Sequence, residues 1–277
     1  MLQSMNSLHN RSIGANDGEV GSLTDLYFDD YDWVVRYLIV DTGTWLNSRE
    51  VLISPIALRY ETMSTDPVYV SLSKAQIENS PSIDVDKPVS RQNESEYLTY
   101  YGYPSYWDGA GIWGGGMYPY ALTPGGNFQR ENRMDREQAE NEFRRREKLA
   151  HAHDDPHLRS MEEVIGYHIH AKDGDIGHVE DILIDDETWA IRYFVLNTSN
   201  WWVGHKVLVS PQWVVDLSWA DESVSLDMTR DIIKSAPHFE GIEDFDREQE
   251  ISLFEHYGRK GYWPDTLATS TAANKAY

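Results

Sequence analysis

The chain has 277 residues, enough for one large domain or two domains of ordinary size. It carries 24 basic and 46 acidic residues, and this net charge of −22 argues against nucleic-acid binding and against docking on an anionic membrane. Because the chain has no cysteine, disulfides, thiolate metal sites and cysteine nucleophiles are excluded. The sequence has no apolar run of membrane-spanning length and no signal-like start, so we expect a cytoplasmic protein without membrane insertion.

The sequence repeats itself without a gap, so that residue n matches residue n + 156. The matches begin with Ile13–Gly21 over Ile169–Gly177 and continue through Arg36-Tyr37 over Arg192-Tyr193. They extend into an aromatic tail, where Tyr101-Gly102 and Tyr106-Trp107 fall on Tyr257-Gly258 and Tyr262-Trp263. We therefore assign a first copy at residues 13–107 and a second copy at residues 169–263.

Each copy has the pattern of short strands joined by tight turns. Asp17-Gly18 and Asp173-Gly174 predict hairpins, because glycine accepts the positive φ of a tight turn. Branched and aromatic residues predict strands at 20–28, 33–40, 51–53, 56–61 and 67–72, and at 176–184, 189–196, 207–209, 212–219 and 223–228. Ser73 and Thr229 are N-cap residues for a short helix that ends at Pro81 or Pro237. Five or six antiparallel strands with one closing helix predict a mainly β chain of two small closed barrels.

The second copy contains a specific combination of residues that resembles the PRC-barrel family. The combination is Gly166-Tyr167, Asp173–Gly177, Val179, Asp181–Asp186, Trp189, Ile191–Tyr193 and Val207–Pro211. The resemblance covers about half of the chain as two tandem barrels, and it implies binding and assembly without catalysis. The membrane helix of the photosynthetic reaction-centre H subunit, a member of this family, has no counterpart in this sequence.

Two unlike segments separate the barrels. Residues 97–120 are rich in tyrosine, tryptophan and glycine, and this segment either packs as a cover on the barrel, which the repeat favours, or forms a free interaction tract. Residues 131–150 predict a charged helix that serves as a connector or docks a partner. The predicted domains are the first barrel at 1–93, the aromatic segment and linker helix at 94–156, the second barrel at 157–240 and a C-terminal tail at 241–277.

The candidate chemical sites are structural in our interpretation. Arg36 and Arg192 lie inside apolar strands, so we expect ion pairs with the turn aspartates Asp25 and Asp181. The acidic pairs Asp29-Asp30 and Asp185-Asp186 admit a divalent cation, and the linker histidines His151, His153 and His157 admit zinc. Turn formation explains the aspartates better and a solvated linker explains the histidines better, so we assign no metal and no cofactor.

The sequence has no hydrolase, nucleotide-binding or metalloprotease motif, and we expect a non-enzymatic protein-binding scaffold. Its partners are proteins, including a second copy of the chain, rather than nucleic acid. The candidate interface residues are the repeated or loop aromatics Trp45, Trp201, Trp202, Tyr101, Tyr106, Trp107, Tyr257 and Trp263. The alternatives are an accessory subunit of a membrane electron-transfer complex, like the H subunit, and a ribosome or RNA-processing accessory.

Overall fold

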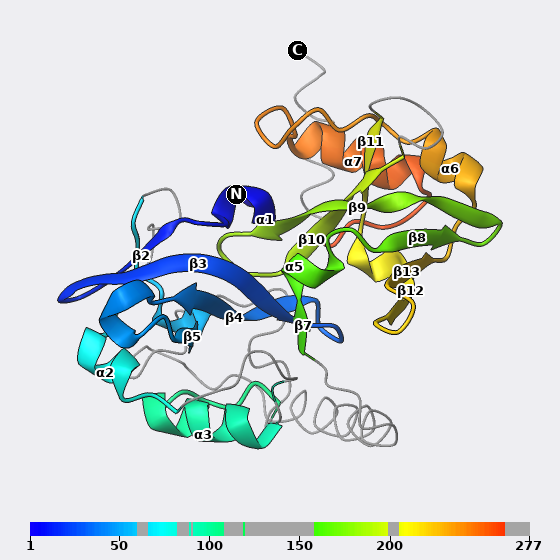
Figure 1. Cartoon of the computed structure of the whole chain (residues 1–277). Helices are drawn as coiled ribbons and strands as arrows, with labels where there is room; N and C mark the ends of the chain where they lie inside the picture. The colour runs from blue at the N-terminus through cyan, green and yellow to red at the C-terminus, as the bar shows by residue number, and fades with distance from the viewer. Residues whose placement is uncertain are drawn as a thin grey trace, which may run out of the picture. The chain divides into compact units, whose positions relative to one another are not determined.

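The structure is a computed structural model that describes residues 1–59, 66–81, 89, 91–107, 119, 158–198 and 205–263. The described chain is mainly β, with two sheets and several short helices (Figure 1). Its contacts define unit 1, formed by Met1–Tyr167 with Asp181–Phe194, and unit 2, formed by His168–Glu180 with Val195–Tyr277. Unit 1 therefore holds the first copy together with part of the second copy. The predicted linker helix at 131–150 lies outside the described residues.

The first sheet has the strand order β5-β4-β3-β2-β6. Its strands are β2 (Ser12–Ala15), β3 (Gly18–Asp29), β4 (Val34–Asp41), β5 (Glu50–Ile53) and β6 (Val68–Tyr69). The predicted hairpin is present, since Ala15 pairs with Gly18 across the turn. Outside this order, β7 (Leu158–Ser160) pairs with β3 (Figure 1).

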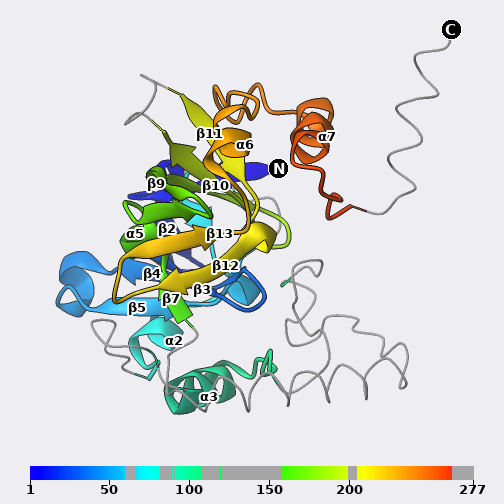
Figure 2. The ribbon, with the colours of Figure 1, turned by 90° about the vertical axis from the view of Figure 1, so that its right-hand side faces the viewer.

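The second sheet has the strand order β11-β10-β9-β8-β13-β12, and in Figure 2 the strands β12 and β13 lie side by side. Its strands are β8 (His168–Ala171), β9 (Gly174–Asp185), β10 (Ile191–Asn197), β11 (Lys206–Val209), β12 (Val214–Ser218) and β13 (Ser223–Leu226). Outside this order, β1 (Leu2–Ser4) pairs with β9. The two copies thus repeat one topology, in which Gly18 and Gly174 start equivalent strands.

The sheets are mixed rather than wholly antiparallel, which corrects the expectation from the sequence. β6 runs parallel to β2, and β13 runs parallel to β8. In the first sheet, the five strands β2 to β6 alternate in direction, which leaves the first and the last pointing the same way. In the described residues, a single isolated bridge between Leu58 and Val70 joins the segments that follow β5 and β6, and no ladder joins the two strands themselves. The closed barrel therefore stays a prediction.

The predicted short helices are α2 (Lys74–Glu78) and α6 (Arg230–Lys234). Ser73 caps α2 with its side chain, while Gln76 bonds back to the backbone of Ser73. The hairpin aspartates add a second contact, because Asp17 Oδ1 accepts from the Lys74 N–H at 2.8 Å and Asp173 Oδ1 accepts from the Arg230 N–H at 2.7 Å. The Asp-Gly turns therefore also hold the helix that follows the last strand.

The aromatic tail of each copy begins with a helix that the sequence interpretation missed. These helices are α3 (Arg91–Tyr101) and α7 (Arg247–His256). Both end at an equivalent glycine with positive φ, 69° at Gly102 and 61° at Gly258. Tyr103 and Arg259 then return a backbone hydrogen bond to Leu98 and Phe254 in the last helical turn. The repeated Tyr-Gly pair is thus a helix end.

Candidate functional site

The strand and helix that directly precede the second copy pack on the first copy, within unit 1. β7 pairs with β3 from Tyr27 to Asp29, and the helix α5 (Met161–Val164) follows it directly. Ser160 Oγ donates to Asp25 Oδ2 at 2.6 Å, and the Glu162 N–H donates to Asp25 Oδ1 at 3.0 Å. Asp25 therefore holds the start of α5, a helix that lies 135 residues further along the chain.

The first residues of the chain make the same contact with the second copy, also within unit 1. β1 pairs with β9 from Leu183 to Asp185, and the helix α1 (Met5–Leu8) follows. Ser4 Oγ donates to Asp181, and the Asn6 N–H donates to Asp181 Oδ1 at 3.2 Å. We call the segments Leu2–Leu8 and Leu158–Val164, with the aspartates that bind them, the reciprocal clasp.

Two tryptophans at equivalent positions join the copies through the backbone. The Val35 N–H donates to the Trp189 carbonyl at 2.9 Å, and the Ile191 N–H donates to the Trp33 carbonyl at 2.7 Å. Both tryptophans have positive φ, 55° at Trp33 and 61° at Trp189, which disfavours a residue with a Cβ atom. This backbone exchange and the reciprocal clasp follow the same 156-residue offset.

Burial makes the carboxyl group of Asp25 a weaker acid than usual. Only 7% of Asp25 is exposed, and this desolvation raises its pKa from 3.8 to about 6, although hydrogen bonds from Ser160, Glu162 and Leu26 act in the opposite direction. Asp25 accepts hydrogen bonds in a contact that joins two distant parts of unit 1. The first half of the reciprocal clasp therefore contains a carboxyl group whose pKa is raised to about 6.

The sequence predicts Asp25 as the carboxyl partner of Arg36, but the structure has Asp29 in this role. Arg36 is fully buried, and its Nη2 lies 3.2 Å from Asp29 Oδ2 and 3.0 Å from Asp32 Oδ2. The guanidinium also lies over the ring of Tyr106, 4.0 Å from its centroid. The physical reason is a bulge in the β3–β4 ladder at Arg36, between the pairs Tyr27–Tyr37 and Phe28–Val35, which breaks simple strand alternation.

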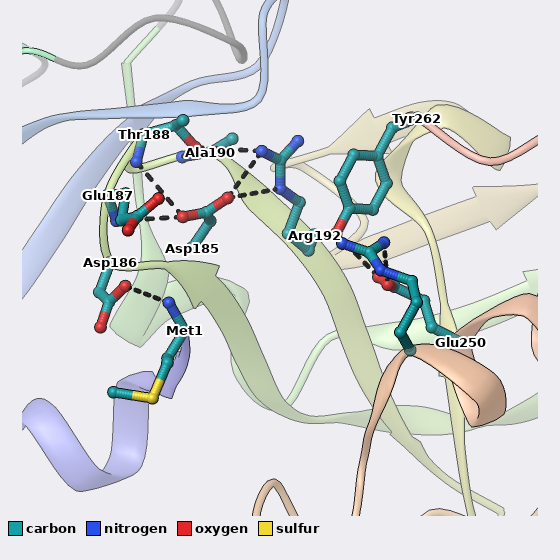
Figure 3. Close-up of polar contacts among 10 residues, drawn as sticks. Met1, Asp185, Asp186, Glu187, Thr188, Ala190, Arg192, Glu250 and Tyr262 are labelled. Carbon is teal, nitrogen blue, oxygen red and sulfur yellow. Dashed lines mark hydrogen bonds and ion pairs between the residues drawn. The ribbon is translucent and has the colours of Figure 1, made fainter. Parts of the chain in front are cut away.

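Arg192 repeats this arrangement in the second copy, and the expected partner Asp181 is again replaced. Arg192 Nη2 lies 2.8 Å from Asp185 Oδ2 and 3.1 Å from Thr188 Oγ1, as Figure 3 shows. Thr188 stands where the first copy has Asp32. The arginine lowers the pKa of Asp185, against the opposing effect of burial, which is the largest single contribution. Both arginines therefore serve as structural cations, fully buried at Arg36 and half-buried at Arg192.

A buried glutamate binds the aromatic tail of the first copy to the sheet. Glu94 on α3 is fully buried, and its Oε1 accepts from the hydroxyl groups of Tyr37 at 3.1 Å and Tyr106 at 2.5 Å. Tyr97 packs edge-on against Tyr37, with 5.3 Å between the ring centroids. Burial and the neighbouring Glu94 raise the pKa of Tyr37 well above its usual value. The first part of the aromatic segment, 97–107, thus packs as a cover.

The corresponding glutamate in unit 2 is Glu250 on α7. Tyr262 donates to Glu250 Oε1 at 2.8 Å (Figure 3). Arg247 donates to the other carboxyl oxygen, Oε2. The Arg247 guanidinium lies over the rings of Tyr262 and Trp263, at 5.7 and 4.8 Å from their centroids. The aromatic tails of both copies are therefore anchored by an acidic residue at the same helical position.

The candidate interface residues divide into buried, partly exposed and undescribed positions. Tyr106, Trp107 and Tyr257 are buried within the chain, so in this conformation they belong to the packing. Trp45 is half-buried: its indole N–H donates to the Val20 carbonyl and Lys74 Nζ lies 4.2 Å from its ring centroid. Tyr101 and Trp263 are also half-buried. Trp201 and Trp202 lie outside the described residues.

The acidic turns are occupied by partners from the chain. Asp30 bonds the guanidinium of Arg159 at 2.5 Å, and Asp186 accepts from the amino group of Met1 (Figure 3). In the described part of the chain, no three histidines, aspartates or glutamates are grouped to hold a metal ion. The same residues contain no helix long and apolar enough to cross a membrane. His151, His153 and His157 lie outside them.

Unit 2 contains a pocket of about 390 Å³, which we call the β11–α7 pocket. Its wall is formed by β11, the segment that follows α6 and the first turns of α7. The lining residues are Leu208, Pro237, His238, Phe239, Glu240, Gly241, Asp244, Phe245, Gln249, Ser252 and Leu253. The sequence analysis did not single out this segment, because it has neither a motif nor a matching acidic–aromatic pattern in the first copy.

The reciprocal clasp was missed as well, although the sequence carried a signal for it. The repeat begins before Ile13, because Leu2, Ser4 and Met5 match Leu158, Ser160 and Met161 at the same offset. These three matches show that the segment before Ile13 also belongs to the repeating unit.

Comparisons with known proteins give one informative match. A protein of Deinococcus radiodurans that is described only as uncharacterized is 30% identical over 97 residues, which is 31% of this chain and 34% of the relative. The match therefore spans about a third of the relative's length. A search against models of protein families finds no family that matches.

Proposed function

We propose that the chain is a non-enzymatic protein-binding scaffold made of two tandem PRC-like barrels. The observation that supports it is the structural use of charged side chains at equivalent positions of the two copies. Asp25 and Asp181 bind the distant segments of the reciprocal clasp. Arg36 and Arg192 pair with Asp29 and Asp185, at the ends of β3 and β9. These groups stabilise structure at equivalent positions, as a rigid framework for partners requires.

Two further features support protein partners. The net charge of −22 disfavours phosphate backbones and steers basic protein surfaces toward the chain. The aromatic residues Trp45 and Trp263 are half-buried, and each lies beside a cation of the same copy, Lys74 or Arg247. Tryptophan contributes strongly to protein interfaces when a partner covers it. The alternatives to this proposal are an accessory subunit of a membrane electron-transfer complex and a ribosome or RNA-processing accessory.

The test is affinity purification of the tagged full chain from its native cells, followed by cross-linking and identification of the bound proteins. Trp201→Ala/Trp202→Ala should keep the thermal unfolding transition and lose a specific cross-linked partner. Trp213→Ala is the matched control, because Trp213 is a buried aromatic packed against Phe254 and Tyr257, and its loss should lower the melting temperature. Salt-sensitive RNA binding by the wild type, or turnover of a small molecule at the clasp residues, would overturn the proposal.

A further inference from the structure

The β11–α7 pocket combines an apolar lining with acidic groups. Leu208 and Leu253 are buried, and Phe239 packs edge-on against Phe245 with 5.8 Å between their ring centroids. Glu240 and Asp244, which line the same pocket, are exposed. A volume of about 390 Å³ lies within the range of pockets that bind ligands of side-chain size and larger. The pocket therefore offers apolar contact and negative charge to one ligand.

The two copies differ in the contacts beside this pocket. In the first copy Arg49 donates to the carbonyl groups of Glu78, Ser80 and Pro81, and so ties β5 to the end of α2. The second copy has His205 at that position, and its ring stacks on His238 at a centroid distance of 5.0 Å. The segment that lines the pocket thus has different contacts from the arginine-tied segment of the first copy.

The residues that give the pocket its chemistry also differ in sequence. Asp244 and Phe245 stand where the first copy has Pro88 and Val89, whereas Leu208 matches Leu52 and the acidic Glu240 matches Asp84. The leucine and one acidic residue are shared by the copies, whereas the second carboxylate, Asp244, and the ring of Phe245 are particular to the second copy. At these two positions the second copy has gained acidic and aromatic character.

The start of α7 does not favour an anion in this pocket. Asp246 caps the helix and accepts from the N–H groups of Glu248 and Gln249, at 2.9 and 3.0 Å. A carboxylate already occupies the donors that an anionic ligand would need. With Glu240 and Asp244 beside it, the pocket has the charge for a cation.

We propose that the β11–α7 pocket binds an arginine or lysine side chain, flanked by an apolar residue, from a peptide segment of a partner protein. The proposal rests on the scaffold function and names the chemistry of its partner. The aliphatic stem and the flanking residue pack on Leu253, Phe239 and Phe245, and the cationic head meets Glu240 and Asp244. Arginine fits better than lysine, because its planar guanidinium both stacks on rings and pairs with carboxylates.

The probe is the peptide acetyl-Gly-Leu-Arg-Phe-Gly-amide, titrated into the ¹⁵N-labelled full chain and followed by backbone amide shifts. Its neutral analogue carries citrulline in place of arginine, and n-butylguanidinium represents a free small cation. We expect the arginine peptide to bind with a dissociation constant below about 1 mM and to shift the amides of residues 239–245. The citrulline peptide should bind at least about fivefold more weakly, as should the small cation, which lacks the flanking residue.

The variant Glu240→Gln/Asp244→Asn should weaken binding of the arginine peptide at least about fivefold and make the remaining binding insensitive to salt. Asp216→Asn/Glu255→Gln removes the same charge from exposed positions outside the pocket lining and should leave binding unchanged. Equal binding of the citrulline peptide, equal effects of the two double variants, or shifts confined to another surface would overturn the pocket assignment. The scaffold proposal fails separately, if the tagged wild type cross-links to no protein while the peptide still binds.

Discussion

The hydroxyl group of Ser160 donates a hydrogen bond to the carboxyl group of Asp25, with an oxygen–oxygen distance of 2.6 Å. Ser160 is also the N-cap of α5, where its Oγ accepts from the Glu163 N–H at 3.0 Å. One side chain therefore caps its own helix and fixes that helix to the first copy. Ser4 has both roles in α1, and its carboxyl partner is Asp181.

Asp25→Asn should remove a pH dependence of stability. Because burial raises the pKa of Asp25 from 3.8 to about 6, the folded state holds this proton more tightly than the unfolded state. The free energy of unfolding of the wild type, relative to the variant, should therefore fall as pH rises from about 4 to about 6, by roughly 1–3 kcal/mol. Urea unfolding at half-unit pH steps measures this difference. Asp181→Asn is the control, because it retains Asp25 and its stability should still fall as pH rises. A difference in unfolding free energy between the wild type and Asp25→Asn that does not change with pH would contradict the prediction.

Ser160→Ala should destabilise the protein more than Ser4→Ala. Both substitutions remove an N-cap, which costs about 0.5–2 kcal/mol. The Ser160 bond to Asp25 is buried, whereas the Ser4 bond to Asp181 is partly exposed. Chemical denaturation at pH 7.5 gives the two free energies, with Ser22→Ala on β3 as the matched control. Equal losses at all three positions would show that the clasp contacts contribute nothing specific.

Arg36→Met should cost about 3–5 kcal/mol of stability, because it leaves the buried Asp29 without its cation. Arg192→Met should cost less, since Asp185 is more exposed than Asp29, with 21% of its side chain accessible against 6%. Arg36→Lys should restore little, because an ammonium group does not reproduce the planar contact with Tyr106. Thermal unfolding ranks the variants, and full rescue by lysine would contradict the role given to the guanidinium plane.

Tyr106→Phe should lower the free energy of unfolding by about 1–3 kcal/mol, because the buried Glu94 loses a hydrogen-bond donor. Tyr262→Phe removes the equivalent bond to Glu250 from a half-buried tyrosine, and its cost should be smaller. The two variants are controls for each other, because each removes a tyrosine hydroxyl group from the same position of one copy. The reverse order, measured by denaturant unfolding, would show that burial does not set the strength of this contact.

Local features of the chain could be predicted because their signals are local. The Asp-Gly pairs and the runs of branched residues gave the hairpins and the strands β3, β4 and β5, whose observed bounds differ from the predicted ones by one or two residues. The N-cap residue Ser73 likewise marked the start of α2. A turn or a cap depends on a few neighbouring residues, and their types can be recognised in sequence.

The helix α3 was missed because its aromatic residues suggested an irregular segment. Glu94, Tyr97, Leu98 and Tyr101 nevertheless have helical spacing, and Gly102 marks the helix end. Burial of a glutamate on the inner face obscured the pattern. A charged residue at a core position is recognised only once its partners, here Tyr37 and Tyr106, are known.

The partners of Arg36 and Asp25 could not be predicted from strand alternation. The register of the β3–β4 ladder shifts between Leu23 and Asp25 and again between Tyr27 and Phe28. Each shift changes which side chains share a face, so Asp29 rather than Asp25 meets the arginine. The contact of Asp25 with Ser160 depends on a segment 135 residues away, and no local pattern encodes such a distance.

The matched contacts of the reciprocal clasp have a consequence for how stability depends on protein concentration. A molecule with one copy could satisfy Asp25 only by borrowing the serine of a second molecule, and dilution would then dissociate it. In this chain both serines and both aspartates belong to one polypeptide, so the same contacts form as an intramolecular event. Because the two copies are covalently linked, they do not need identical residues at matching positions. A difference such as Asp32 against Thr188, or Arg49 against His205, has to suit only the copy in which it occurs.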